Sequence, residues 1–428
     1  NDLLHAMKVL ILNTSSNIGG AAVAAHRLKN ALLKIGVEAK MLVRDGKERD
    51  SVSLITHSWW GRKINLFRFY WERLVIFLCN HFNRKELFRV SIANTGSDIS
   101  LRKDISEADI IHLHWINQGF LSLSDIEKLV KMGKKIVWTM HDMWACTGIC
   151  HHARNCSAYT SECRNCFYLN GGNSRGKDLS TTIFYQKKRI YSNANMTFVC
   201  CSQWLKGKAQ KSLLLQGKPI IAIPNPIDMS KFYPQDKKSS REYFRLPPNK
   251  ELLLFGALNV TDERKGVSYL LKALNALKSS RNIGLVIFGN IKSQIEELVP
   301  VPIFAVGYLS DEKEIACLYN AVDAFVSSSL DENLPNTLME SLACGTPCVG
   351  FRTGGIPEMI EHKKNGYVAE YGSAEDLARG IQWVLDYPDK EALSRACVEK
   401  VEKEYAEEVV ARKYLECYQY LCRQETKD

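Results

Sequence analysis

The sequence has no apolar run long enough to cross a membrane, and it is poor in glycine and proline. No stretch reaches the roughly 18 uninterrupted apolar residues that a transmembrane helix needs. With 26 glycines and 12 prolines among 428 residues, and no internal repeat, a collagen-like or low-complexity chain is excluded. The apolar fraction of 46% and the charged fraction of 24% exclude a disordered adaptor. The length predicts two or three globular domains.

The amino terminus lacks the apolar segment of a signal peptide, which affects how the cysteines are interpreted. The first apolar run, residues 9–12, ends at Asn13 and is too short for such a segment. The 14 cysteines are therefore expected to be thiols or metal ligands in a reducing compartment rather than disulfides. We expect a cytoplasmic protein. Its formal net charge of +10 favours anionic partners such as phosphates, nucleic acid or acidic lipids.

Short apolar runs alternate with helical patterns along the chain, which is typical of parallel α/β sheets. Two sets of predicted strands are separated by PNP at 224–226, where two prolines favour a non-helical joint. The first set covers residues 7–13, 109–113, 135–140, 196–200 and 219–223, and the second covers 251–255, 284–288, 303–306, 324–327 and 347–350. The sequence predicts two Rossmann-like, doubly wound domains facing across a cleft, followed by a helix over residues 406–423.

The most informative segment follows the predicted strand at 324–327. Glu332 and Glu340 stand eight positions apart, separated by a turn at Pro335, and a helical pattern starts near Asn336. A helix amino terminus offers N–H groups to a phosphate, and a carboxylate one turn into the helix can accept hydrogen bonds from the hydroxyls of a ribose. Two such glutamates are usually solvated surface charges. Here, however, CGTP at 344–347 and GGIPE at 354–358 follow them.

This order of motifs resembles the retaining glycosyltransferases of family four, which have the GT-B architecture and include many bacterial capsule and exopolysaccharide enzymes. The resemblance covers nearly the whole chain and includes GG at 19–20, TMHD at 139–142, PNPID at 224–228 and RKG at 264–266. It implies three parts: an acceptor-side domain over 1–224 with a cysteine-rich insert at 146–166, a nucleotide-sugar-binding domain over 225–405, and a helix at 406–428 that packs back on the first domain.

The resemblance implies a donor site in the second domain. Glu340 matches the glutamate that holds the ribose, Glu332 the one that faces the transferred sugar, and Lys265 the cation that neutralises the diphosphate leaving group. The family often has an arginine at the position of Asn259, so either Arg264 serves instead or the diphosphate is held by one cation together with backbone N–H groups. The other expected donor contacts are Gly307 and Tyr308 beside the nucleobase, and Asn333, Leu334, Pro335, Asn336 and Gly355 around the sugar and phosphates.

In the first domain the resemblance implies that Gly19, Gly20 and His141 lie at the ligand. Gly19 and Gly20 follow a predicted strand and open a helix, where the backbone can approach a phosphate or sugar, although a lone Gly-Gly is usually a tight turn. His141 ends a predicted strand and matches a histidine that touches the donor sugar near the reacting carbon. With Glu332 and Lys265 it forms the expected catalytic set.

The chain also contains no Asp-x-Asp, the motif by which glycosyltransferases of the other main architecture hold a metal. The resemblance therefore implies transfer with retention and without a catalytic metal. The donor would be a UDP- or GDP-linked sugar, and the acceptor a hydroxyl of a glycan or lipid-linked glycan.

Five cysteines fall within residues 146–166. Cys150, Cys156, Cys163 and Cys166 have the spacing C-x5-C-x6-C-x2-C, and the closing C-x2-C is common in zinc sites. A subset of the family carries the same four cysteines, so we predict a structural zinc bound by them, with Cys146 as an extra. Free thiols and disulfides stay open as alternatives.

Residues 59–90 are both aromatic and basic. Seven arginines and lysines stand against only Glu72 and Glu86, and tryptophan, phenylalanine and tyrosine are interleaved with them. This composition favours an amphipathic segment at a membrane surface, with a core helix that has a basic solvent face as an equal alternative. We expect peripheral contact with the inner membrane face, from which a lipid-linked acceptor could be reached.

Two other functions remain open from the sequence. A sugar-nucleotide epimerase of the same architecture would turn over the donor without an acceptor. A zinc-containing nucleic-acid-binding protein would fit the charge of +10 and the cysteine cluster. Because the basic residues outside 59–90 are dispersed, we expect no nucleic-acid partner.

Overall fold

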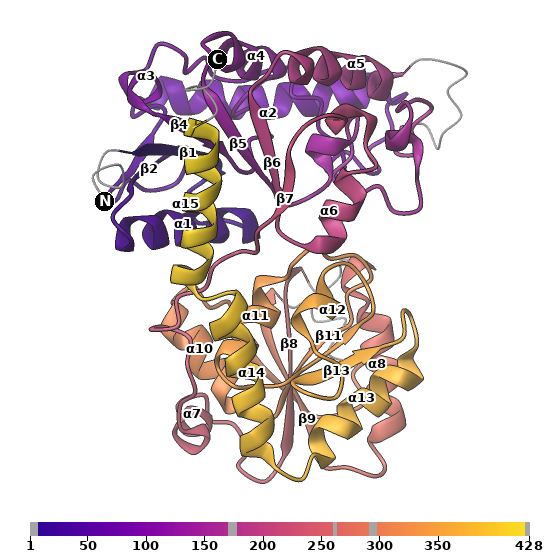
Figure 1. Cartoon of the computed structure of the whole chain (residues 1–428). Helices are drawn as coiled ribbons and strands as arrows, with labels where there is room; N and C mark the ends of the chain where they lie inside the picture. Colours follow the sequence, from indigo (N-terminus) through magenta and orange to yellow (C-terminus); the bar gives the residue numbers. More distant parts are fainter. Residues whose placement is uncertain (1–6, 170–177, 260–262, 291–297, 424–428) are drawn as a thin grey trace. The chain divides into compact units, whose positions relative to one another are not determined.

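A computed structural model describes residues 7–169, 178–259, 263–290 and 298–423 of the chain. The chain divides into two compact units (Figure 1). Unit 1 consists of Asn1–Pro224 together with Val410–Asp428, and unit 2 consists of Asn225–Val409. No helix in the described ranges has the length and apolar character that a membrane span requires.

Unit 1 is built on a parallel sheet. Its described part contains seven strands in the order β3-β2-β1-β4-β5-β6-β7. These strands are β1 (Lys8–Ser15), β2 (Glu38–Asp45), β3 (Val52–Leu54), β4 (Ile110–Leu113), β5 (Lys135–Met140), β6 (Met196–Cys200) and β7 (Ile220–Ala222). Every residue of β4 and β6 is buried, because a parallel sheet is covered on both faces.

Helices form a separate core on each face of this sheet. On one face α1 (Gly20–Lys34) and α15 (Glu407–Arg423) pack with Val9 and Ile11 of β1. On the other face α4 (Leu123–Lys131) and α5 (Leu179–Ser192) pack with Leu10 and Leu12. The remaining α-helices of this unit in the described residues are α2 (Trp59–Cys79), α3 (Lys103–Glu107) and α6 (Gln203–Ala209).

Helix α15 comes from the far end of the chain and completes the core of unit 1 (Figure 1). Val410, Ala411 and Leu421 are buried against the face that also receives α1. Two tyrosines of α15 form hydrogen bonds with side chains of β4 and β5. Tyr418 Oη lies 2.7 Å from His112 Nδ1, and Tyr414 Oη lies 2.8 Å from Thr139 Oγ1. The carboxyl-terminal helix is therefore an integral part of unit 1.

Unit 2 has a second parallel sheet, with six strands in its described part in the order β10-β9-β8-β11-β12-β13. The strands are β8 (Glu251–Asn259), β9 (Ile283–Asn290), β10 (Ile303–Gly307), β11 (Ala324–Ser327), β12 (Cys348–Phe351) and β13 (Gly366–Ala369). The α-helices in the described part of this unit are α7 (Lys237–Tyr243), α8 (Val267–Leu277), α10 (Glu312–Ala321), α11 (Asn336–Ala343), α12 (Ile356–Met359), α13 (Ala374–Asp386) and α14 (Lys390–Glu404).

Both sheets are doubly wound, which confirms the fold predicted from the sequence. The strand order reverses between β1 and β4 in unit 1, and between β8 and β11 in unit 2. Open α/β sheets bind ligands beyond the carboxyl ends of their strands at such reversal points. The segments that follow these four strands are therefore where a site is expected in each unit.

Candidate functional site

In unit 2 a lysine and a glutamate meet at the reversal point. Lys265 ends the short 3-10 helix Glu263–Lys265 that follows β8, and its Nζ pairs with Oε1 of Glu332, which lies in the loop after β11. Ser329 Oγ donates to the same carboxylate oxygen at 3.3 Å. The two charged side chains are 31% and 18% exposed, so the ion pair is open to a ligand from solvent.

Backbone contacts hold this pair in place. Leu330 N donates to Arg264 O at 2.7 Å, and Ser328 Oγ donates to Lys265 O at 2.8 Å. Gly266 has a φ of +60°, and a Cβ there would lie 2.0 Å from Ser328 O. Only glycine allows both this φ and this approach, so the start of α8 is fixed against the loop that carries Glu332.

The GGIPE motif supports the same loop from the other side. Gly355 N donates to Asn333 O at 2.7 Å. Gly354 has a φ of +54°, and a Cβ on it would lie 1.5 Å from Glu332 O. The motif therefore fixes the main chain at Glu332, and the importance of Gly354 emerges only from this contact.

Glu340 lies one turn into α11 and is 8% exposed. Tyr319 Oη of α10 donates to its Oε2 at 3.2 Å, and burial together with this carboxylate raises the pKa of Tyr319 well above its ordinary value. The helix begins after Pro335, whose side chain makes no capping hydrogen bond. N–H groups of the first turn and a buried carboxylate thus stand together, which suits a phosphate beside a ribose.

The other predicted donor residues are more scattered. Asn333 and Leu334 are buried in the loop between β11 and α11, and Asn336 Oδ1 accepts a hydrogen bond from Asn225 Nδ2 at 3.2 Å. Gly307 and Tyr308 lie at the end of β10, the edge strand two places from β8, and Tyr308 is exposed. Arg264 is half-buried, and Asn259 ends β8, its side chain being outside the described residues.

In unit 1 the loop after β1 leads into an open helix start. Gly19 is the N-cap of α1, has a φ of +91°, and would meet nothing within 4 Å if it carried a Cβ. Ser15 Oγ accepts a hydrogen bond from Ile18 N at 3.0 Å, which shapes the turn. Gly20 is exposed at the first position of the helix. The space beside Gly19 allows a ligand to approach the backbone.

His141 follows β5 and is held by a second histidine that sequence analysis missed. His114, after β4, places its Nδ1 2.9 Å from His141 Nε2, while Cys201 Sγ lies 3.6 Å from His141 Nδ1. Burial lowers the pKa of His141 to about 4 and that of His112 to about 3. His141 is therefore neutral near pH 7. The alternating histidines of IIHLHW were the available signal for His114.

Asp142, next to His141, is an ionised carboxylate with three N–H donors. Oδ1 accepts from Trp144 N at 2.8 Å, and Oδ2 accepts from Trp115 Nε1 at 3.0 Å and from His151 Nδ1 at 2.7 Å. Burial alone would raise the pKa of Asp142, but His151 and the N–H of Trp144 lower it below its usual range. The end of β5 is thus fixed by contacts from three segments.

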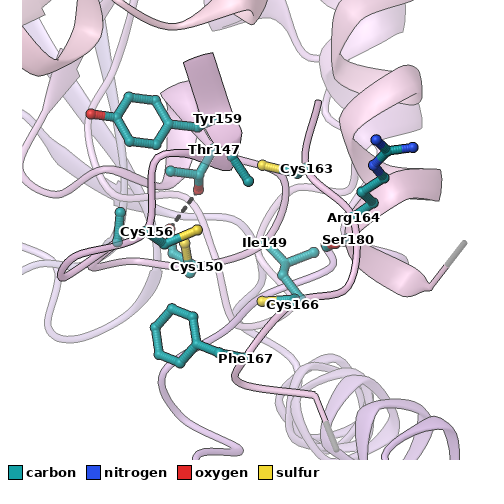
Figure 2. Close-up of a pocket in the computed structure, with 12 residues that line it drawn as sticks. Thr147, Ile149, Cys150, Cys156, Tyr159, Cys163, Arg164, Cys166, Phe167 and Ser180 are labelled. Carbon is teal, nitrogen blue, oxygen red and sulfur yellow. Dashed lines mark hydrogen bonds between the residues drawn. The ribbon is translucent and has the colours of Figure 1, made fainter. Parts of the chain in front are cut away.

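The four predicted zinc ligands line one pocket (Figure 2). Cys150, Cys156, Cys163 and Cys166 all contribute to its wall, and Cys146 is not among the lining residues. All the cysteines are free thiols, so none of them forms a disulfide. In the described part of the chain no group of three or more histidine, cysteine or acidic side chains is assembled as a metal site.

Helix α2 buries several polar residues and exposes most of its large apolar ones. The buried residues are Asn65, Glu72, Arg73 and Ile76, of which Glu72 and Arg73 form an ion pair at 2.7 Å. Glu72 Oε1 also accepts hydrogen bonds from two backbone N–H groups at 92 and 93. The exposed large apolar residues of the helix are Trp59, Trp60, Ile64, Leu66, Phe67, Tyr70, Trp71, Leu74 and Leu78.

Two doubly wound units, each with candidate groups near the reversal point of a parallel sheet, are the arrangement expected of the GT-B class of glycosyltransferases. The chain belongs to the glycosyltransferases of group 1 and family 4. Residues 18–231 match Glycosyltransferase Family 4, and residues 236–403 match Glycosyl transferases group 1. The predicted family and enzyme class are confirmed, and these two matches give no support to the epimerase or the nucleic-acid-binding alternative.

Relatives and solved structures agree with this family. Over 383 residues the chain is 25% identical to the putative colanic acid biosynthesis glycosyl transferase WcaC of Escherichia coli K12, covering 85% of this chain and 88% of that protein. Its fold is similar to that of sucrose-phosphate synthase from Thermosynechococcus elongatus (TM-score 0.67, 16% identity, 98% and 100% of the two chains covered). It is also similar to that of Anabaena HepE, solved in complex with UDP (TM-score 0.63, 14% identity, 97% and 100% covered).

Proposed function

We propose that the chain transfers a sugar with retention of anomeric configuration and without a catalytic metal. The donor is a UDP- or GDP-linked sugar, and the acceptor is a hydroxyl of a glycan or lipid-linked glycan. The observation that carries the proposal is the group around the loop at 328–335, where Lys265 pairs with Glu332 and Glu340 lies one turn into α11. HepE, similar in fold, is solved with UDP, which supports a nucleotide of this kind.

In this proposal unit 2 binds the donor. Lys265 and the N–H groups of the first turn of α11 bind the diphosphate, and Glu340 accepts hydrogen bonds from the ribose. An ammonium group has three N–H donors, so Lys265 can bind a phosphate oxygen while it still contacts Glu332. The remaining proposed donor contacts are Asn259, Arg264, Gly307, Tyr308, Asn333, Leu334, Pro335, Asn336 and Gly355.

The reaction breaks the bond between C1 of the sugar and the diphosphate oxygen, and the electron pair leaves with the phosphate. Lys265 stabilises the negative charge on the leaving group, while Glu332 stabilises the positive charge that develops on the sugar. The acceptor oxygen bonds to C1 on the face that the phosphate leaves, and its proton passes to the leaving phosphate oxygen. No side chain then has to act as base, and neutral His141, with Gly19 and Gly20, contributes contacts to the donor.

Turnover with defined donors tests this reaction. The protein is assayed with UDP- and GDP-sugars and a glycan acceptor, and the anomeric configuration of the product is read from proton NMR couplings. We expect the configuration of the donor to be kept and brief exposure to EDTA to leave the rate unchanged. An inverted product would refute retention, and immediate loss of activity with EDTA would refute metal-independent transfer.

We also propose that the four cysteines bind a structural zinc. Four thiols around one pocket are the donor set of a closed zinc site. Lys187 of α5 lies near these thiols and is fully buried. Its Nζ donates to Trp144 O at 2.6 Å and to Thr147 O at 3.0 Å. Burial lowers the pKa of Lys187 to about 7, because a buried cation is unfavourable and no carboxylate among the described residues pairs with it. Four thiolates on a zinc ion carry a net negative charge, which supplies the negative partner that the ammonium form of Lys187 lacks.

Metal analysis tests the zinc proposal. We expect about one zinc per purified chain, because a four-thiolate site is closed by a single ion. Cys163→Ser should lose the zinc, while Cys79→Ser, at an exposed cysteine outside the cluster, should keep it. Zinc-free protein in which all four cluster thiols react with a thiol reagent would contradict the proposal.

We propose further that α2 binds the anionic inner face of the membrane peripherally. The exposed residues Trp60, Ile64, Phe67, Trp71, Leu74 and Leu78 recur at spacings of three and four, so they form one stripe along the helix. Arg62, Lys63, Arg84 and Lys85 are exposed in the same segment, and their charge complements an acidic lipid surface. An apolar stripe beside basic side chains fits an interfacial helix better than a core helix.

Liposome sedimentation tests the role of α2. We expect binding to vesicles rich in phosphatidylglycerol that weakens as salt rises, and little binding to neutral vesicles. Trp71→Glu should reduce binding by about tenfold, because it removes a large apolar group from the bilayer interface and adds a repelled charge. Leu101→Glu, at an exposed leucine outside the helix, is the control. Equal binding by the two variants would contradict docking through α2.

A further inference from the structure

The cysteine-rich insert at 146–166 touches the candidate site through the side chain of His151, which follows the predicted ligand Cys150. His151 Nδ1 lies 2.7 Å from Asp142 Oδ2, and its Nε2 lies 3.1 Å from Ser91 Oγ. Both ring nitrogens of this histidine are therefore bound, and the residue is 7% exposed. The proposed reaction and the proposed zinc make no use of this contact.

The chemistry of the partners fixes the direction of these hydrogen bonds. An ionised Asp142 can only accept, so His151 Nδ1 carries the hydrogen and Nε2 is left as an acceptor. Ser91 then donates its hydroxyl hydrogen to Nε2, while its oxygen accepts from Arg73 Nη2 at 3.3 Å. The hydrogen bonds from Arg73 to Ser91, from Ser91 to His151 and from His151 to Asp142 therefore all run in the same direction. His151 is fixed as the tautomer that carries its hydrogen on Nδ1.

Backbone hydrogen bonds also hold His151 in place. His151 N donates to Arg89 O at 3.0 Å, and His151 O accepts from Met143 N at 2.9 Å. An antiparallel bridge joins the neighbouring residues Val90 and Cys150. The insert is thus tied to the chain two residues beyond His141, both through the main chain and through the Asp142 carboxylate.

The series Ser91, His151, Asp142 has the connectivity of a Ser–His–Asp triad, but it is not built for nucleophilic attack. Ser91 is 1% exposed, and its Oγ is bound by both His151 and Arg73. A nucleophile must reach a substrate carbon, and this hydroxyl is enclosed. The arrangement therefore fixes the position of Asp142.

We propose that His151 is a positioning residue for the strand end that carries His141, and that the cysteine-rich insert serves the reaction by holding His151 there. This inference rests on the proposed role of His141 at the donor sugar. Loss of the His151 N–H would leave Asp142 Oδ2 with Trp115 as its one side-chain donor among the described contacts. The strand end would then loosen, and small displacements of groups at a reacting centre reduce turnover strongly.

Three variants test the proposal. His151→Leu removes the N–H, His151→Asn restores a donor close to the position of Nδ1, and His57→Leu is a control at an exposed histidine outside the insert. Hydrogen exchange of the backbone at 141–145 is measured together with kcat. We expect His151→Leu to speed exchange there and lower kcat by about tenfold to a hundredfold. His151→Asn should recover most of both, and His57→Leu should change neither.

The two readouts separate this inference from the proposed function. Hydrogen exchange does not depend on turnover. If the variants change exchange as expected but the wild-type protein has no transferase activity, the proposed function is refuted and the structural role of His151 at the strand end remains. His151→Leu with wild-type exchange and kcat would overturn the inference. If His151→Leu lowers the melting temperature, the Asn variant decides: a folded His151→Asn protein that is as impaired as the Leu variant overturns it too.

Discussion

Lys265→Ala lowers kcat by roughly a hundredfold or more, the largest effect expected of a single substitution in this chain. The leaving diphosphate gains negative charge as the bond to the sugar breaks, and Lys265 is the cation at the reversal point of unit 2. Without it, charge stabilisation in the transition state is lost, and Glu332 loses the ammonium group with which it pairs. Steady-state kinetics with saturating donor measure the effect.

The control for this prediction is Lys272→Ala. Lys272 is an exposed lysine of α8, seven positions further along the chain, and should leave kcat near the wild-type value. Equal melting temperatures of the two variants establish that the comparison concerns catalysis rather than folding. A Lys265→Ala enzyme with kcat within a few-fold of wild type would remove Lys265 from the mechanism.

Glu340→Gln weakens nucleotide binding by about tenfold to a hundredfold. The substitution keeps the shape of the side chain but removes the charge that strengthens hydrogen bonds from two ribose hydroxyls, which are together expected to be worth about 1.5–3 kcal/mol. Because the ribose does not react, the donor KM and the nucleotide Kd should rise while kcat changes less. Isothermal titration with the free nucleoside diphosphate measures the change directly.

Tyr319→Phe is the matched control for Glu340. It removes the hydroxyl that donates to Glu340 Oε2 at 3.2 Å and leaves the carboxylate in place. We expect its effect on nucleotide affinity to be only a few-fold, because the ribose contact remains. If Glu340→Gln bound the nucleotide as tightly as the wild type, the ribose contact would have to be assigned elsewhere.

The fold could be predicted from local patterns, because buried parallel strands consist of short apolar runs in the sequence. β2 (Glu38–Asp45) was not predicted, since it interrupts its apolar residues with Glu38, Lys40 and Arg44 beside the sheet edge. β13 (Gly366–Ala369) was also not predicted. In contrast, the helix start near Asn336 follows a clear turn at Pro335, and α11 begins there.

The contacts within the candidate site were much less predictable than its members. Lys265 and Glu332 were chosen from motifs, but their ion pair joins segments 67 positions apart. Tyr319 and His151 gave no local signal of their roles, because each acts through a partner that only the folded chain brings near. The inverted arrangement of α2 was also hidden: composition identified an amphipathic segment, but only the fold separates the buried Glu72–Arg73 pair from the exposed aromatic stripe.

The most direct test of the central claim is nucleotide-dependent thermal stabilisation of the wild type and of Glu340→Gln. Melting temperatures are measured with UDP, GDP, ADP and their sugars, with and without EDTA. We expect UDP or GDP to stabilise the wild type by about 2.7 kcal/mol at a hundred times its Kd, equally with EDTA, and to stabilise Glu340→Gln far less at the same concentration. Stabilisation by no nucleotide, or equal stabilisation of both proteins, would contradict a donor site built on Lys265, Glu332 and Glu340.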